Sequence, residues 1–162
     1  MKYLEILIKL RKIIRSINLE SKKIEKELGI SIPQLLVLQY LSDQEDFKAF
    51  AKDIKSFMNL NASTVSGIIR RLESKSLIAK LPKPDDKRAT FITLTAKGSE
   101  LLSKSPTTLQ EKLSKRLKDL NSHQIEELNR NIELLTYIME VEDMDAAPLL
   151  TIKEIADPKN NV

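Results

Sequence analysis

The stretch from Asn61 to Gly98 constrains the fold more than any other part of this chain. It reads as an amphipathic helix, a short strand, a basic loop and a second strand. In the helix, apolar residues recur from Val65 to Leu72 at the spacing that buries one face, and short polar side chains and two arginines occupy the other face. A helix of this kind beside a basic hairpin is typical of a domain that reads two DNA grooves. DNA binding is therefore the first functional hypothesis.

A shorter helix is predicted directly before this one, over residues 50–58. Asn59 can adopt the left-handed conformation that ends such a helix. Asn61 or Ser63 can then cap the longer helix. Two helices joined by about three residues form a helix-turn-helix candidate.

The segment after these helices predicts a hairpin. Apolar residues at 77–81 indicate one strand, and Phe91–Leu94 indicates its partner because it is rich in β-branched and aromatic residues. Between them lies PKPDDKRAT, whose prolines and aspartates favour a turn. This turn places Lys83, Lys87 and Arg88 at the tip of the hairpin. Directly after a helix-turn-helix, such a basic hairpin is interpreted as a wing.

The rest of the chain is predicted to be helical. One long helix covers residues 2–27 and is closed by Gly29, and Ser31 caps a second helix. From Ala96 the chain returns to helix, with a break or a new start near Pro106. The predicted fold class is mainly α with a small β-hairpin wing (α+β), as a winged helix-turn-helix lobe plus N- and C-terminal helices.

The distribution of charge supports the nucleic-acid hypothesis. The net charge of the chain is +4, but residues 61–98 hold eight lysines and arginines against three acidic residues. Residues 140–162 hold two basic residues against six acidic ones. A basic centre followed by an acidic tail is a feature of proteins that bind nucleic acids.

The composition argues against several other classes of protein. With no cysteine, the chain can form neither disulfides nor thiolate metal sites nor a cysteine oxidation sensor. His123, the single histidine, cannot build a histidine zinc site, and no metal or cofactor is expected. The chain has neither a glycine-rich phosphate loop nor a G-x-S-x-G motif, so we do not expect an enzyme. No apolar run reaches the roughly 18 residues of a membrane span.

The order of the predicted elements and several motifs resemble the MarR family of bacterial transcription regulators, over roughly residues 1 to 141. The sharpest match is Asp86-Lys87-Arg88, followed by Phe91–Thr95 and Gly98. Upstream segments that resemble the recognition-helix pattern of the family are Ser63–Ser66, Arg71–Glu73 and Leu77–Ile78.

The chain departs from the family pattern at four positions. Lys55 and Asn59 stand where the family usually has alanine and glycine, and Ser76 stands where glycine usually precedes the leucine-isoleucine pair. We expect the same backbone there with slightly altered turns. Gly67 stands where many members have a larger polar or basic side chain, so a sequence preference cannot be transferred from a relative.

The resemblance implies roles for individual residues. Arg88 would enter the minor groove from the wing, with Lys83 and Lys87 contacting phosphates. Asp86 would pair with Arg71 or Arg70 and hold the wing, although aspartate in a turn can also serve nearby backbone amides. The residues expected to contact DNA from the recognition helix are Asn61, Ser63, Thr64, Ser66, Gly67, Arg70 and Arg71. Capping is the competing role for Asn61 and Ser63.

Apolar stripes on the terminal helices exceed what a winged helix can cover, which predicts a homodimer. The predicted domains are a helical dimerisation region at 1–30 and 99–141, a DNA-binding domain at 31–98 and an acidic tail at 142–162. Two recognition helices in a twofold dimer predict an inverted-repeat operator in double-stranded DNA. The resemblance further implies a cytoplasmic regulator, expected to be a repressor released by a small-molecule effector, whose binding site the sequence does not predict.

Two alternatives remain open at this stage. A winged helix can be a protein-interaction module that does not bind DNA. Residues 1–17 could instead anchor a helical protein on a membrane surface, because they form a basic amphipathic segment. The preferred interpretation of that segment is a helix packed against a partner.

Overall fold

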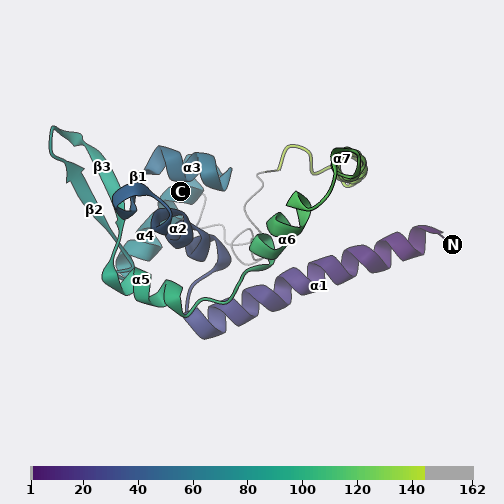
Figure 1. Cartoon of the computed structure of the whole chain (residues 1–162), viewed down its shortest axis with the longest axis horizontal. Helices are drawn as coiled ribbons and strands as arrows, with labels where there is room; N and C mark the ends of the chain where they lie inside the picture. The colour runs from purple at the N-terminus through teal and green to yellow at the C-terminus, as the bar shows by residue number, and fades with distance from the viewer. Residues whose placement is uncertain (1, 145–162) are drawn as a thin grey trace. The chain divides into compact units, whose positions relative to one another are not determined.

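The computed structural model describes residues 2–144 and divides the chain at Pro106 into two compact units. The first unit contains most of the elements (Figure 1). In chain order they are α1 (Lys2–Leu28), α2 (Ile32–Ser42), the 3-10 turn η1 (Glu45–Phe47), β1 (Lys48–Phe50), α3 (Ala51–Met58), α4 (Ala62–Ser74), β2 (Ile78–Lys83), β3 (Asp86–Leu94) and α5 (Ala96–Ser103). The second unit contains α6 (Leu109–Lys118) and α7 (Ser122–Ile138). The chain is therefore mainly helical with a small sheet, as predicted.

The helix boundaries follow local signals in the sequence. Gly29, at φ 69°, follows the last residue of α1. Ser31 caps α2 through a capping box with Gln34. The chain leaves the helical conformation between α5 and α6, and Thr108 caps α6. The break predicted at Pro106 is thus confirmed. The part of the predicted acidic tail beyond residue 144 lies outside the described residues.

The sheet has three antiparallel strands in the order β1-β3-β2, so the predicted two-stranded hairpin is extended by β1. Phe50, predicted within a helix, is the last residue of β1 and pairs with Phe91. Their rings stack with centroids 4.3 Å apart. A strand of three residues is too short to show an alternating pattern, and the partner that holds it lies some forty residues further along the chain.

The two strands of the hairpin are longer than the sequence suggested. Only Pro84 and Asp85 lie in the turn, and Lys83 pairs with Asp86 across it. The tip that was predicted as a loop is therefore mostly strand. Proline is tolerated in β2 because β2 is an edge strand of the sheet. Figure 1 shows the hairpin projecting away from the helices of this unit.

A single apolar core holds the first unit together. Helix α2 is almost entirely buried, and the predicted apolar stripe of α4 faces it. The largest fully buried side chains are Ile24, Ile30, Ile32, Leu35, Leu38, Leu41, Ile54, Met58, Ile68, Leu72, Leu77 and Ile78. This core fixes α4 and the base of the hairpin on one scaffold.

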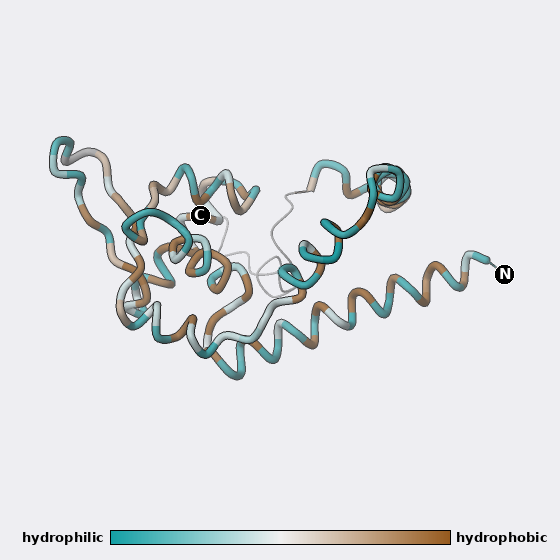
Figure 2. Tube along the Cα trace, in the orientation of Figure 1, coloured by the Kyte–Doolittle hydropathy of each residue, from teal (hydrophilic) through white to brown (hydrophobic). Residues whose placement is uncertain are grey.

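Other apolar residues remain uncovered in the single chain. In α1, Ile13 is 55% exposed and Tyr3 is 57% exposed. In α7, Ile132 is 50% exposed and Ile138 is 66% exposed. Figure 2 shows apolar residues repeated along the whole length of α1. Monomeric proteins rarely expose apolar surface on this scale.

Candidate nucleic-acid interface

Helix α4 begins with a complete cap. The Asn61 side-chain oxygen accepts a hydrogen bond from the backbone N–H of Thr64 at 2.8 Å and another from the Ser63 hydroxyl at 2.7 Å. The sequence left capping open to either Asn61 or Ser63, and the structure assigns it to Asn61. Ser63 supports the cap, and its hydroxyl oxygen retains capacity to accept a further hydrogen bond.

The two faces of α4 are sharply different. Val65, Ile68, Ile69 and Leu72 are buried in the core. The predicted contact residues Ser63, Ser66 and Arg70 are exposed, and Thr64, Gly67 and Arg71 are partly exposed. The structure therefore brings the predicted recognition residues together on one outward face, as short side chains toward the start of the helix and arginines toward its end.

The turn between α3 and α4 is that of a helix-turn-helix. Asn59 adopts the left-handed conformation at φ 51°, and Leu60 is buried. Helices α3 and α4 pack against each other after this turn. Asn59 thus takes a conformation in which the family's usual glycine would be unstrained.

A second left-handed residue ends α4. Ser76 has φ 60°, and the Leu77 N–H bonds back to the Leu72 carbonyl at 3.0 Å. This is the Schellman arrangement that glycine normally completes. At both turns, asparagine and serine therefore take the left-handed conformation that glycine adopts without strain. The slight alteration of the turns relative to the family stays a prediction.

The wing brings the predicted basic residues to the end of the hairpin. Lys83 is partly exposed in β2 and lies opposite the exposed Asp86. The next pair is Pro82 with Thr90, so the register shifts and β3 carries the extra residues 87–89. Lys87 and Arg88 therefore lie in an irregular part of β3 beside the tip. The predicted pairing of Asp86 with Arg71 or Arg70 stays a prediction.

Contacts that the sequence did not reveal attach the wing to α4. Glu73 in α4 forms an ion pair with Lys80 in β2 at 2.8 Å. The Thr95 hydroxyl donates to the Ser76 carbonyl at 2.8 Å, and its backbone N–H donates to the Leu77 carbonyl at 3.2 Å. Since each contact joins residues well apart in sequence, a local pattern could not have predicted it.

The lysines near the end of α4 extend this attachment. The Lys97 ammonium donates to the Lys75 carbonyl at 2.9 Å, and the Lys75 ammonium donates to the Gly29 carbonyl. Three consecutive carbonyls, those of residues 75, 76 and 77, are thus bonded by the segment Thr95–Lys97. We name this group of bonds the α4 anchor.

Gly98 allows the α4 anchor to form. A Cβ atom built on Gly98 would lie 2.2 Å from the Leu77 carbonyl oxygen and 2.7 Å from Leu94 Cδ1. Gly98 also donates its backbone N–H to the Thr95 hydroxyl, which caps α5. Close packing at this position explains the glycine of the motif in physical terms.

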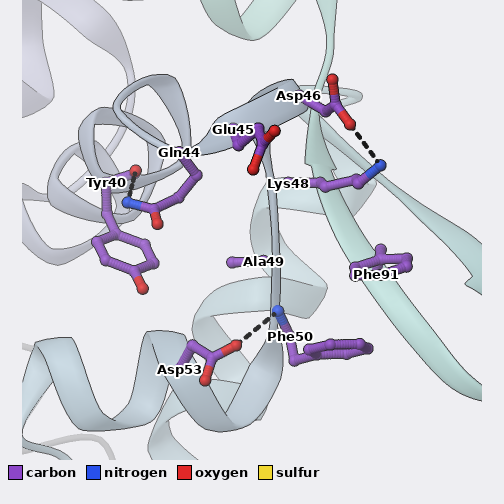
Figure 3. Close-up of a pocket in the computed structure, with 9 residues that line it drawn as sticks. All are labelled: Tyr40, Gln44, Glu45, Asp46, Lys48, Ala49, Phe50, Asp53 and Phe91. Carbon is purple, nitrogen blue, oxygen red and sulfur yellow. Dashed lines mark hydrogen bonds and ion pairs between the residues drawn. The ribbon is translucent and has the colours of Figure 1, made fainter.

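A pocket of about 290 Å³ lies beside β1 in the same unit (Figure 3). Burial, and secondarily the charge of Asp53, raise the pKa of Tyr40 in its wall. Lys48 is paired with Asp46 at 2.9 Å. Three carboxylates against one lysine make the pocket unsuited to a DNA phosphate. Its lining is Tyr40, Gln44, Glu45, Asp46, Lys48, Ala49, Phe50, Asp53 and Phe91.

Two further features bear on other classes of function. Within residues 2–144, no three histidine, cysteine or acidic side chains are grouped closely enough to hold a metal ion. In the same range, none of the helices combines the length and the apolar character needed to cross a membrane.

Comparison with known proteins places these features in a family. A family model described as MarR family matches residues 30–90. The HTH-type transcriptional regulator MgrA of Staphylococcus aureus is 31% identical over 110 residues, which are 68% of this chain and 72% of MgrA. The HTH-type transcriptional repressor IacR of Pseudomonas putida is 24% identical over 119 residues, which are 74% of this chain and 70% of IacR.

A solved structure shares the fold. The crystal structure of an S. aureus MepR–DNA complex matches with a TM-score of 0.60 at 22% identity, covering 80% of this chain and 95% of that chain. The matched region therefore extends well beyond the helix-turn-helix and its wing.

Proposed function

Because this chain belongs to the MarR family and is a DNA-binding transcription regulator, we propose that it is a dimeric cytoplasmic repressor which a small-molecule effector releases from its operator. The family consists of transcription regulators and not of enzymes. The observation that carries the proposal is the outward polar face of α4, held by the α4 anchor beside a basic wing.

In the proposed complex α4 lies in the major groove. Short hydroxyl side chains such as Ser63 and Ser66 suit phosphates or base edges, and Arg70 suits the O6 and N7 acceptors of guanine. From the wing, Arg88 enters the minor groove, whose potential is most negative where A·T pairs narrow it. Lys83 and Lys87 contribute phosphate contacts that carry no sequence information.

The exposed apolar residues of α1 and α7 support a dimer. Burying them between two chains removes apolar surface that the single chain leaves in water. A twofold dimer presents two α4 helices to successive major grooves, roughly 34 Å apart. The proposed operator is therefore an inverted repeat.

The proposed release by an effector is a linkage effect. A dimer whose two lobes change their spacing can bind DNA at one spacing and an effector at another, so that each ligand weakens the other. The relative IacR is named a transcriptional repressor, which supports the proposal that this chain represses and does not activate transcription.

The test is recovery of bound DNA from a random pool by the full chain, followed by affinity measurements over a range of salt concentrations. We expect an inverted repeat whose log K falls by about 0.9 per phosphate neutralised for each tenfold rise in salt. Sedimentation of the free protein should give a dimer. A pool without enrichment, or a flat response to salt, would contradict the proposal and favour a protein-interaction module.

A further inference from the structure

The three glycines of this chain have three different structural situations. Gly29 lies at φ 69°, where an L side chain is strained. Gly98 has no room for a Cβ atom. Gly67 is different, because a Cβ atom built there meets Arg71 Nη1 at 3.5 Å and Nη2 at 4.0 Å, which are ordinary contacts. Neither backbone conformation nor packing among the described residues requires a glycine at position 67.

Gly67 nevertheless weakens the helix that contains it. It lies in the middle of α4, where glycine is less favourable than alanine because its backbone loses more conformational freedom on folding. Gly67 therefore makes the fold less stable, and nothing in the fold explains why a glycine stands there.

The position of Gly67 on α4 suggests a function for which the lower stability is tolerated. The buried residues Val65, Ile68, Ile69 and Leu72 define the core side of α4. At 100° per residue, Gly67 lies close to the direction opposite their centre, in the middle of the face that meets DNA under the proposed function. One side of the resulting notch is bordered by the Arg71 guanidinium.

The chemistry of the notch selects what can enter it. The N–H and C=O groups of a residue inside an α-helix are bonded within that helix, so Gly67 offers space and a Cα–H group but no polar partner. In the major groove, G, A and C display hydrogen-bonding groups, whereas T also projects the apolar C5-methyl group. The floor of the notch at the Gly67 Cα carries no polar group and fits that methyl group, with the Arg71 guanidinium at one side.

We propose that Gly67 determines specificity by admitting the C5-methyl group of one thymine in each half-site of the operator. The inference rests on the proposed function and deepens it, since it names a base and the group on it that is read. The glycine acts through the absence of a side chain, which lets α4 approach that base closely.

The experiment adds a methyl group to the protein by Gly67→Ala and removes a C5-methyl group from the DNA. The operator is recovered from a random pool with the wild-type chain, and each thymine is then replaced singly by uracil, which lacks only the C5-methyl group. Affinities of wild type and Gly67→Ala are measured at fixed salt. Ser74→Ala, an exposed change two turns further along α4, is the control.

We expect Gly67→Ala to bind the thymine operator about ten-fold more weakly than wild type. Uracil at one position in each half-site should restore its affinity, because the DNA then lacks the group that the new methyl excludes. Gly67→Ala should also unfold at a temperature higher by roughly 2–4 °C, which shows that the loss of affinity is not a loss of fold. Ser74→Ala should bind like wild type.

Two results overturn the inference while leaving the proposed function intact. One is unchanged affinity of Gly67→Ala for the thymine operator. The other is a loss of affinity that no uracil position restores. If the wild-type chain enriches no sequence from the pool, the proposed function fails, and the inference fails with it.

Discussion

Replacing Gly98 by alanine adds one methyl group where the structure has least room for it. The new Cβ atom would lie 2.2 Å from the Leu77 carbonyl oxygen. A carbon and an oxygen in contact are normally about 3.3 Å apart, so the two must separate by roughly 1 Å. That carbonyl is held by the Thr95 N–H at 3.2 Å, and the Gly98 N–H is held by the Thr95 hydroxyl at 3.0 Å.

The magnitude follows from these contacts. Moving the new Cβ atom away from the Leu77 carbonyl oxygen weakens the Thr95–Leu77 hydrogen bond, worth about 1 kcal/mol, and the cap of α5, worth about 1 kcal/mol. Overpacking against Leu94, whose Cδ1 lies 2.7 Å from the new Cβ atom, adds roughly 1–3 kcal/mol. The better helix propensity of alanine offsets about 1 kcal/mol. Gly98→Ala should therefore lower the free energy of unfolding by about 2–4 kcal/mol.

The assay is urea unfolding followed by circular dichroism, at one protein concentration because a dimer's stability depends on it. Gly67→Ala is the matched control, since it makes the same change of atoms in a helix where the Cβ atom has room. It should raise the free energy of unfolding by up to about 1 kcal/mol. If Gly98→Ala proves as stable as wild type, the packing argument for the α4 anchor is refuted.

Three further predictions concern the turn, the wing and a surface charge. Ser76→Gly should raise the free energy of unfolding by about 1 kcal/mol in urea, because it relieves a left-handed serine; no gain would mean that the turn is unstrained. Arg88→Ala should weaken operator binding by roughly 1–3 kcal/mol in a gel shift and should leave the dimer intact. The control Arg130→Ala, which replaces an exposed arginine, should not weaken operator binding. A hydrogen bond from Lys104, helped by its charge, lowers the pKa of Glu100 below 4.5. The stability that the Glu100–Lys104 pair contributes is present above that pH and is lost as the pH falls through the lowered pKa. Wild type and Glu100→Gln should therefore converge in acid-unfolding curves. A difference in stability that stays constant with pH would exclude the pair as its source.

The helices could be predicted from sequence because their signals are local. The apolar spacing of α4 and the caps at Ser31 and Asn61 depend on residues within a few positions of each other. Left-handed Asn59 was predicted for the same reason. The apolar stripes of α1 and α7 could also be predicted from the sequence. Their burial, however, depends on a partner that a single chain does not supply.

What sequence reasoning missed depends on residues far apart in the chain. Strand β1 exists because it pairs with β3, and its three residues have no strand signal of their own. The contacts of Thr95 and Lys97 at the end of α4 use side chains that read as ordinary surface residues. In the wing, the basic residues were predicted, but the register shift beside Lys83 depends on how two strands pair.

The α4 anchor has a mechanical consequence. The Lys75 ammonium donates to the Gly29 carbonyl, just after α1, and the Lys75 carbonyl accepts from the Lys97 ammonium, at the start of α5. One residue at the C-terminal end of α4 therefore bonds both the segment that enters from α1 and the segment that leaves through α5. A shift of either segment relative to α4 consequently disturbs a hydrogen bond at the same residue.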